Sequence, residues 1–161
     1  MNINLPAAPS EFVALVQGFL ADAGHESESD TPIGAVEITS GQSAVVLRPH
    51  PEEANVLLLE VEAAEASTLE DDSPAWVRLH RLNAEMRFTT GWSIVVEDDA
   101  IFLARPVSIS ATTPQMLGSL ILEGLDRAEG LRAAIEAASR LDGPPLDAGE
   151  AVEPQMLVQH A

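Results

Sequence analysis

The chain has 161 residues, and its 26 aspartates and glutamates outnumber 8 basic residues, which gives a formal net charge of −18. All eight basic residues are arginines, and there is no cysteine. This balance disfavours nucleic acid and anionic membranes as partners, because both attract an excess of Lys and Arg. The lack of cysteine excludes disulfides, thiolate zinc sites and thiol catalysis. Since 46% of the residues are apolar, the chain can bury a core and is not a disordered acidic tail.

No targeting signal is visible at the N-terminus. Residues 1–9 contain no Lys or Arg and no long apolar run, both of which a secretory signal needs. The longest unbroken apolar runs, such as residues 56–59, fall far short of the roughly 20 residues that span a bilayer. We therefore expect a soluble cytoplasmic protein that does not insert into a membrane.

The first predicted element is a helix that begins near residue 10. Ser10 is expected to cap it, with Pro9 just outside and Glu11 in the first turn, where a carboxylate suits the helix dipole. Gly24 is expected at its C-terminal end. Apolar side chains recur on one face at helical spacing. They are Phe12, Leu15, Val16, Phe19 and Leu20.

Three strands are predicted next, over residues 35–39, 44–48 and 55–62, because apolar residues alternate with polar ones or form short apolar runs there. An acidic, turn-rich stretch precedes them. The connection that follows, residues 63–73, is also acidic and is expected to be mobile.

A second helix is predicted from about Ser73 to Phe88, with Ser73 as its cap and Pro74 at its first position. Its apolar residues share one arc and its charged residues the opposite arc. The apolar arc holds Trp76, Leu79, Leu82 and Met86, and the charged arc holds Arg78, Arg81 and Glu85. With three arginines against one glutamate, this is the one segment with a net positive balance.

A hairpin and a long helix complete the predicted fold. Residues 92–97 and 100–105 form the hairpin around an Asp98-Asp99 turn, and the helix runs from about residue 112 to 139. Three glycines within the helix, Gly118, Gly124 and Gly130, mark either close packing or a kink.

The predicted order is therefore α-β-β-β-α-β-β-α, an α+β sandwich with a mostly antiparallel sheet packed by helices. We assign residues 1–141 to a single domain and residues 142–161 to a flexible Pro-rich, acidic tail.

Motifs for chemistry are missing from the sequence. The acidic run at residues 25–30 lacks the ligand pattern of a calcium loop, and nothing pairs Ser43 with His50 or His80 as a hydrolase would require. Paired carboxylates such as Asp98-Asp99 are best explained as turns. We expect no catalytic residue, no cofactor and no metal, and hence no enzyme.

The predicted helices and strands have more apolar surface than a two-layer domain of this size can bury between its layers. We infer that the remaining apolar surface contacts partners, although a thicker core is the simpler alternative.

Several stretches resemble the class I type III secretion chaperones, the CesT/SycE-like or Tir chaperone family of Gram-negative bacteria. The resemblance covers residues 9–139, and four segments carry it. They are the first helix at residues 12–20, the second at residues 79–86, the hairpin at residues 91–105 and the closing helix at residues 117–138. The tail beyond Leu141 departs from the family pattern.

The resemblance implies a homodimer that does no chemistry and holds the N-terminal region of one or more secreted effector proteins in extended form. Two sets of residues then acquire roles. The implied effector grooves contain Phe12, Val16, Phe19, Leu47, Leu57 and Leu59. The implied dimer interface contains Trp76, Leu79, Leu82, Met86, Trp92 and Ile94.

Two other functions stay open at this point. One is a regulatory or adaptor domain of the same fold without a secretion client, similar to the YbjN-like proteins. The other is a small enzyme such as a hot-dog thioesterase, although that fold places its longest helix before most of the sheet. Most acidic residues lie between the predicted helices and strands or at their ends, where their charge would keep a protein with apolar binding surfaces soluble. In a dimer, Arg78 and Arg81 would face acidic segments of the second subunit or limit repulsion at the rim.

Overall fold

A computed structural model describes residues 8–24, 34–69 and 74–141 of the chain. Its elements follow the predicted order, so the predicted α+β fold is confirmed. The predicted tail, residues 142–161, lies outside the described residues, and its separation from the domain stays a prediction. No helix in the described part is long and apolar enough to cross a membrane.

Five strands form one antiparallel sheet in the spatial order β1-β2-β3-β5-β4. The strands are β1 (Val36–Ser40), β2 (Ser43–Pro49), β3 (Val56–Glu65), β4 (Ser93–Glu97) and β5 (Ala100–Ser108). The predicted turn at Asp98-Asp99 is confirmed, and both residues have positive φ angles, 47° and 68°. The sheet therefore has two edges, β1 on one side and β4 on the other.

The third strand is longer than predicted. It continues to Glu65 with an irregularity between Glu62 and Ala64, and a short 3-10 helix, η1 (Ala66–Thr68), follows. The expectation that a link begins at residue 63 was therefore wrong for residues 63–68, while residues 70–73 of that predicted link lie outside the described residues. Alanine is a weak strand former, but Ala64 pairs with Ile101 of β5 and Ala63 is almost fully buried, so tertiary contacts override propensity here.

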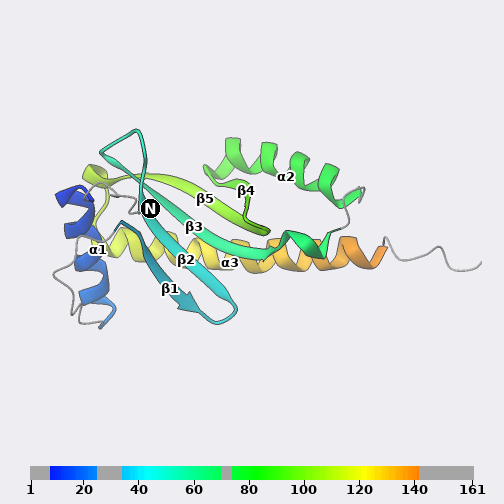
Figure 1. The fold of residues 1–161 in the computed structure, drawn as a ribbon, viewed down its shortest axis with the longest axis horizontal. Coiled ribbons are helices and arrows are strands. Elements are labelled where there is room, and N and C mark those ends of the chain that lie inside the picture. The colour runs from blue at the N-terminus through cyan, green and yellow to red at the C-terminus, as the bar shows by residue number, and fades with distance from the viewer. Residues whose placement is uncertain (1–7, 25–33, 70–73, 142–161) are drawn as a thin grey trace, which may run out of the picture.

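The long helix α3 (Pro114–Leu141) packs mainly on β3 and covers one face of the sheet, which we call the inner face. Figure 1 shows α3 running the length of the sheet, with α1 at one end and α2 beside β4 and β5. The inner-face side chains of the three central strands are fully buried or nearly so. They include Val45, Leu47, Leu57, Leu59, Val61, Leu103 and Val107.

Close packing, one of the two alternatives that the sequence left open for the glycines, is found at Gly124 of α3. A Cβ atom there would lie 2.6 Å from Cη2 of Trp92 and 2.8 Å from Cγ2 of Val61, so only glycine lets the helix approach the sheet this closely. A Cβ atom at Gly118 would make an ordinary contact with Phe19, and one at Gly130 would meet nothing within 4 Å.

The first helix, α1 (Ser10–Asp22), packs against α3 and not across the sheet. The expected Ser10 cap is wrong: Pro9 is the N-cap residue, its carbonyl accepts a bond from the Val13 N–H, and the Ser10 hydroxyl donates to Glu11 instead. Proline has no backbone N–H and cannot make the hydrogen bond of a helix interior, so the helix does not extend further toward the N-terminus than Pro9. Gly24 has a φ of +78° just after the helix, as predicted.

The second helix, α2 (Pro74–Thr90), lies beside β4 and the C-terminal half of α3. Its two arcs are placed as predicted. Leu79 is buried and Trp76, Leu82 and Met86 pack against the core, while Arg78, Arg81 and Glu85 are exposed. The predicted cap, Ser73, lies outside the described residues.

Candidate partner-binding surfaces

Two side chains that a hydrolase could have used, Ser43 and His50, are hydrogen-bonded within the chain. The Ser43 hydroxyl lies 2.8 Å from Nη2 of Arg132, which donates to it, and Nδ1 of His50 accepts backbone N–H groups of Glu52 and Glu53. Within the described residues, no group of three or more His, Asp or Glu side chains is placed to hold a metal ion. The acidic run at residues 25–30 is not described.

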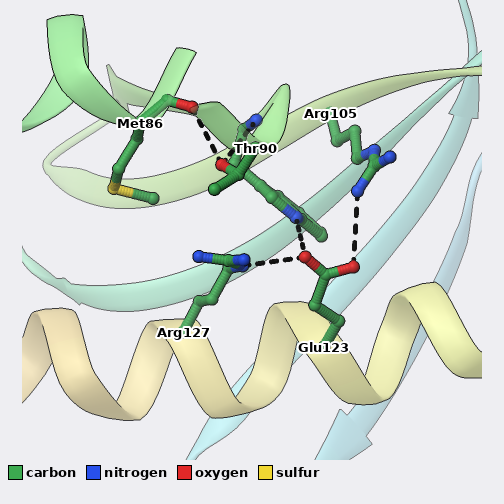
Figure 2. A network of polar contacts seen from close by, with 6 residues as sticks. Met86, Thr90, Arg105, Glu123 and Arg127 are labelled. Atoms are coloured by element: carbon green, nitrogen blue, oxygen red, sulfur yellow. Dashed lines mark hydrogen bonds and ion pairs between the residues drawn. The ribbon is translucent and has the colours of Figure 1, made fainter. Parts of the chain in front are cut away.

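A polar network joins the sheet to α3 around one carboxylate. Glu123 accepts hydrogen bonds from Nε1 of Trp92 at 3.1 Å, Nε of Arg127 at 2.9 Å and Nη1 of Arg105 at 3.3 Å. Figure 2 shows the Glu123 carboxylate between the two arginines, with Arg105 reaching it from β5. The Arg105 guanidinium also lies over the Trp92 ring, 5.7 Å from its centroid, which favours a cation–π contact.

The protonation of Glu123 reflects these contacts. Burial raises the pKa of its carboxyl group, but the hydrogen bonds from Arg127 and Trp92 and the charges of Arg105 and Arg127 outweigh burial, so the pKa lies below its ordinary value. The network therefore stabilises the ionised form and holds α3 on the sheet. These contacts between Glu123 and the sheet define what we call the seam between α3 and the sheet.

The register of the strands determines which backbone groups point out of the sheet. The Ile109 N–H bonds to the Asn55 carbonyl, so alternate residues of β5, including Ala104 and Phe102, direct their backbone groups toward β4. Ser93 and Val95 of β4 pair with these two. The intervening residues Ile94 and Val96 therefore point their N–H and C=O groups outward, along the free edge.

Side chains of α2 occupy most of this β4 edge. The Asn83 side-chain oxygen accepts the Ile94 N–H at 2.7 Å, and its amide nitrogen donates to the Ile94 carbonyl at 3.2 Å. The Thr90 hydroxyl accepts the Trp92 N–H at 3.3 Å and donates to the Met86 carbonyl, a contact drawn in Figure 2. Of the outward positions in β4 itself, Val96 is the one that α2 leaves uncovered among the described residues.

The β1 edge is different. The His50 N–H bonds to the Val56 carbonyl, and the same alternation across β2 then directs Val36, Ile38 and Ser40 toward β2. Glu37 and Thr39 consequently point their N–H and C=O groups away from the sheet. Their side chains are exposed, and no described side chain bonds to these four backbone groups. Among residues 8–24, 34–69 and 74–141, nothing therefore occupies the β1 edge, and it can accept another strand.

The six residues predicted for the effector grooves lie mainly in the hydrophobic core. Phe12 and Val16 of α1 and Leu47, Leu57 and Leu59 of the sheet are almost fully buried, and Phe19 is half-buried against α3. The structure brings the three sheet residues together on the inner face, beneath α3, with the α1 residues at one end. Their role in effector binding stays a prediction.

The six residues predicted for the dimer interface also face the chain's own interior. Trp92 is fully buried and Leu79 nearly so, and the others are partly buried against the core: Trp76, Leu82, Met86 and Ile94. The role of these six residues stays a prediction. The accessible arc of α2 is the opposite one, where Phe88 is 90% exposed and Val77 is 72% exposed. Arg78, Arg81 and Arg87 lie on the exposed surface of the same helix, and Arg81 pairs with Glu85 at 3.4 Å.

On the outer face of the sheet, opposite α3, a charged pair lies among half-buried apolar side chains. Arg48 of β2 donates two hydrogen bonds to Glu60 of β3, at 2.8 and 2.6 Å. The bond to Glu60 raises the pKa of Arg48, which the charges of Glu60 and Glu97 reinforce against burial. Val46 and Leu58 flank this pair and retain some exposed surface.

Sequence reasoning missed the residues that distinguish the two edges: Glu37, Thr39, Asn83 and Thr90. One signal was present. Asparagine is a poor residue for a helix interior because its side chain competes for backbone groups, so Asn83 in the middle of α2 indicates a side chain with a specific hydrogen-bonding task.

Comparison with known proteins finds matches for this chain among solved structures but not among sequences. No family model and no curated protein sequence matches it. Solved structures do match. A chain in the crystal structure of the ExsC–ExsE complex is 19% identical, with a TM-score of 0.66, covering 78% of this chain and 93% of that one.

Two further structures agree. The complex of the Yersinia pestis type III secretion chaperone SycH with a stable fragment of YscM2 matches at 19% identity and a TM-score of 0.58, over 74% of this chain and 98% of the other. The HopA1–SchA chaperone–effector complex matches at 13% identity and a TM-score of 0.61, over 76% and 94%. The predicted secretion-chaperone-like fold is therefore confirmed.

Proposed function

We propose that this protein is a type III secretion chaperone that binds the N-terminal region of one or more effector proteins in extended form and keeps them soluble and competent for export. It acts in the cytoplasm by binding and not by catalysis. The similarity of its fold to chains in secretion chaperone and chaperone–effector complexes supports this. The observation that carries the proposal is the open β1 edge, because an extended chain can add to such an edge as a further strand.

The open edge offers a guest both backbone and side-chain contacts. The N–H and C=O groups of Glu37 and Thr39 are spaced two residues apart, as a pairing strand requires. Val36 and Ile38 are only half-buried on the inner face, so alternate apolar side chains of a guest would find neighbours there. An extended segment with alternating apolar residues therefore fits this edge better than a folded domain does.

The experiment that tests this proposal is capture by the tagged chain in cells that contain a type III secretion system. Thr39→Pro removes an outward N–H and leaves the pairing of β1 with β2 intact, so we expect it to abolish capture. Val96→Pro is the matched control, because it removes an outward N–H from the β4 edge. We expect the wild-type chain and Val96→Pro to retain a secreted protein through its N-terminal region.

Two results would contradict the proposal. Equal capture by wild type and Thr39→Pro would show that the β1 edge is not the binding site. Capture of no secreted protein would instead favour the adaptor domain without a secretion client.

We further propose that the chain forms a homodimer through the exposed arc of α2. Phe88 and Val77 expose apolar surface on this arc beside three arginines, in a chain whose net charge is −18. A second copy is a fitting partner, because it supplies abundant carboxylates for the arginines and an equal apolar arc. We expect substitutions on this arc to weaken self-association without unfolding the chain, which sedimentation at several concentrations would measure.

A further inference from the structure

The two sheet edges differ in one physical respect. At the β1 edge, no described residue bonds to the four outward backbone groups of Glu37 and Thr39. At the β4 edge, Asn83 satisfies both outward groups of Ile94 with bonds of 2.7 and 3.2 Å. Just before β4, the Thr90 hydroxyl accepts the N–H of Trp92.

An unpaired strand edge is a template on which another chain can form hydrogen bonds. The amide side chain of asparagine carries one acceptor and two donor hydrogens, so it reproduces the pair of bonds that a neighbouring strand would make to one residue. A strand approaching β4 would have to displace Asn83 from Ile94, and it would find only Val96 unoccupied within that strand. The exchange replaces two existing hydrogen bonds by two new ones and gains little.

We propose that Asn83 closes the β4 edge to strand addition and thereby leaves β1 as the edge that accepts an extended guest. This inference rests on the proposed function for the identity of the guest, but the closing of the β4 edge does not depend on it. Asn83 is a positioning residue in this account: it selects where a strand binds and does not itself contact the guest.

The position of α2 supports this role. Asn83 is half-buried on the side of α2 that carries the apolar arc, and its two hydrogen bonds to Ile94 show that its side chain faces β4. Leu79, one turn before it, is buried, and this packing holds the helix at a fixed distance from β4. The Asn83 side chain is thus held in the position where a neighbouring strand would bond to Ile94.

The test uses the purified protein itself as the associating strand, so it needs no guest. Because the natural chain has no cysteine, Val96→Cys gives a unique reporter on the β4 edge and Thr39→Cys gives a matched one on the β1 edge. Asn83→Leu is introduced into each, and cross-linking between copies by a short bis-maleimide is timed. Asn83→Leu should increase the rate in the Val96→Cys chain about tenfold, the size expected for freeing two backbone groups, and should leave the Thr39→Cys chain unchanged.

Two results would overturn the inference: an unchanged cross-linking rate in the Val96→Cys chain, or an equal increase at both reporters, which would indicate that the whole fold is loosened. Circular dichroism verifies that each variant is folded.

If Asn83→Leu does not fold, Asn83→Asp takes its place, because it keeps the acceptor for the Ile94 N–H and loses only the donor. A smaller increase restricted to the Val96→Cys chain is then expected, and no increase would overturn the inference. Guest capture by the unmodified chain is measured separately, so a failure of the proposed chaperone function can be distinguished from a failure of the proposed role of Asn83.

Discussion

The seam between α3 and the sheet and the outer arc of α2 are built in opposite ways. In the seam, Gly124 lets the helix touch Trp92 and Val61, and Glu123 bonds to three partners around the same tryptophan. On the outer arc, Phe88 and Val77 are largely exposed. The difference separates residues that hold this chain together from residues available to a partner, and it predicts that substitutions in the two regions affect different measurements.

The largest effect is expected at Gly124. Gly124→Ala places a methyl group within 3 Å of both Trp92 and Val61, so we expect the free energy of unfolding to fall by about 1–3 kcal/mol. Gly130→Ala is the matched control on the same helix, where the new methyl group meets nothing, and it should raise stability by about 0.5–1 kcal/mol. Chemical denaturation measures both. Unchanged or increased stability of Gly124→Ala would show that α3 does not pack closely at Gly124.

A smaller, pH-dependent effect is expected at Glu123. Because its pKa is lower in the folded chain than its ordinary value of 4.5, ionised Glu123 contributes stability above that value and loses this contribution as the pH falls through the folded pKa. Glu123→Gln should therefore be less stable than wild type at neutral pH. The difference in the free energy of unfolding between wild type and Glu123→Gln should become smaller as the solution is acidified below pH 4.5.

The control for this prediction is Asp126→Asn, which removes an exposed carboxyl group on the same helix. Asp126 has no ion pair within the described part of the chain, so its variant should differ little from wild type at either pH. Denaturation curves at neutral and acidic pH measure these differences. A gap for Glu123→Gln that stays constant with pH would contradict the stabilising network around the ionised carboxylate.

The smallest effect on folding is expected on the outer arc. Phe88→Ser should change the free energy of unfolding by less than about 0.5 kcal/mol, since the ring is 90% exposed. It should nevertheless weaken self-association, because it removes the largest apolar side chain of the proposed interface. Sedimentation velocity over a concentration series measures this.

Leu122→Ser is the matched control for Phe88→Ser, because Leu122 is 69% exposed but lies on α3. It should leave self-association unchanged. A double Arg78→Glu, Arg81→Glu variant tests the charge contribution of the same arc. If that variant still sediments as a dimer at low salt, the arginines do not face acidic segments of a second copy.

Much of the fold could be predicted from the sequence where one pattern dominates. The helical spacing of Leu79, Leu82 and Met86 predicted the buried arc of α2, and the order of the elements predicted the antiparallel sheet. The sequence failed where a tertiary contact decided the outcome. β3 continues past Glu62 because Ala64 and Glu65 pair with β5, and Gly124 and Gly130 look alike in the sequence although only one touches a neighbouring strand.

The candidate binding surface was less predictable than the fold. An apolar residue such as Leu59 is equally compatible with a groove and with a core, and only three-dimensional packing distinguishes them. The open edge depends on the alternation of backbone groups in β1, which leaves no mark in the side chains of Glu37 and Thr39. The closed edge depends on Asn83, whose unusual place within a helix was the one visible signal.

Amide hydrogen exchange, residue by residue, tests the central claim most directly, with the chain alone and in complex with the protein that it captures. We expect the amides of Glu37 and Thr39 to exchange much more slowly in the complex, because they become hydrogen-bonded to the guest strand, while exchange at the amide of Val96 is unchanged. Slower exchange at Val96 with no change at Glu37 and Thr39 would contradict the central claim.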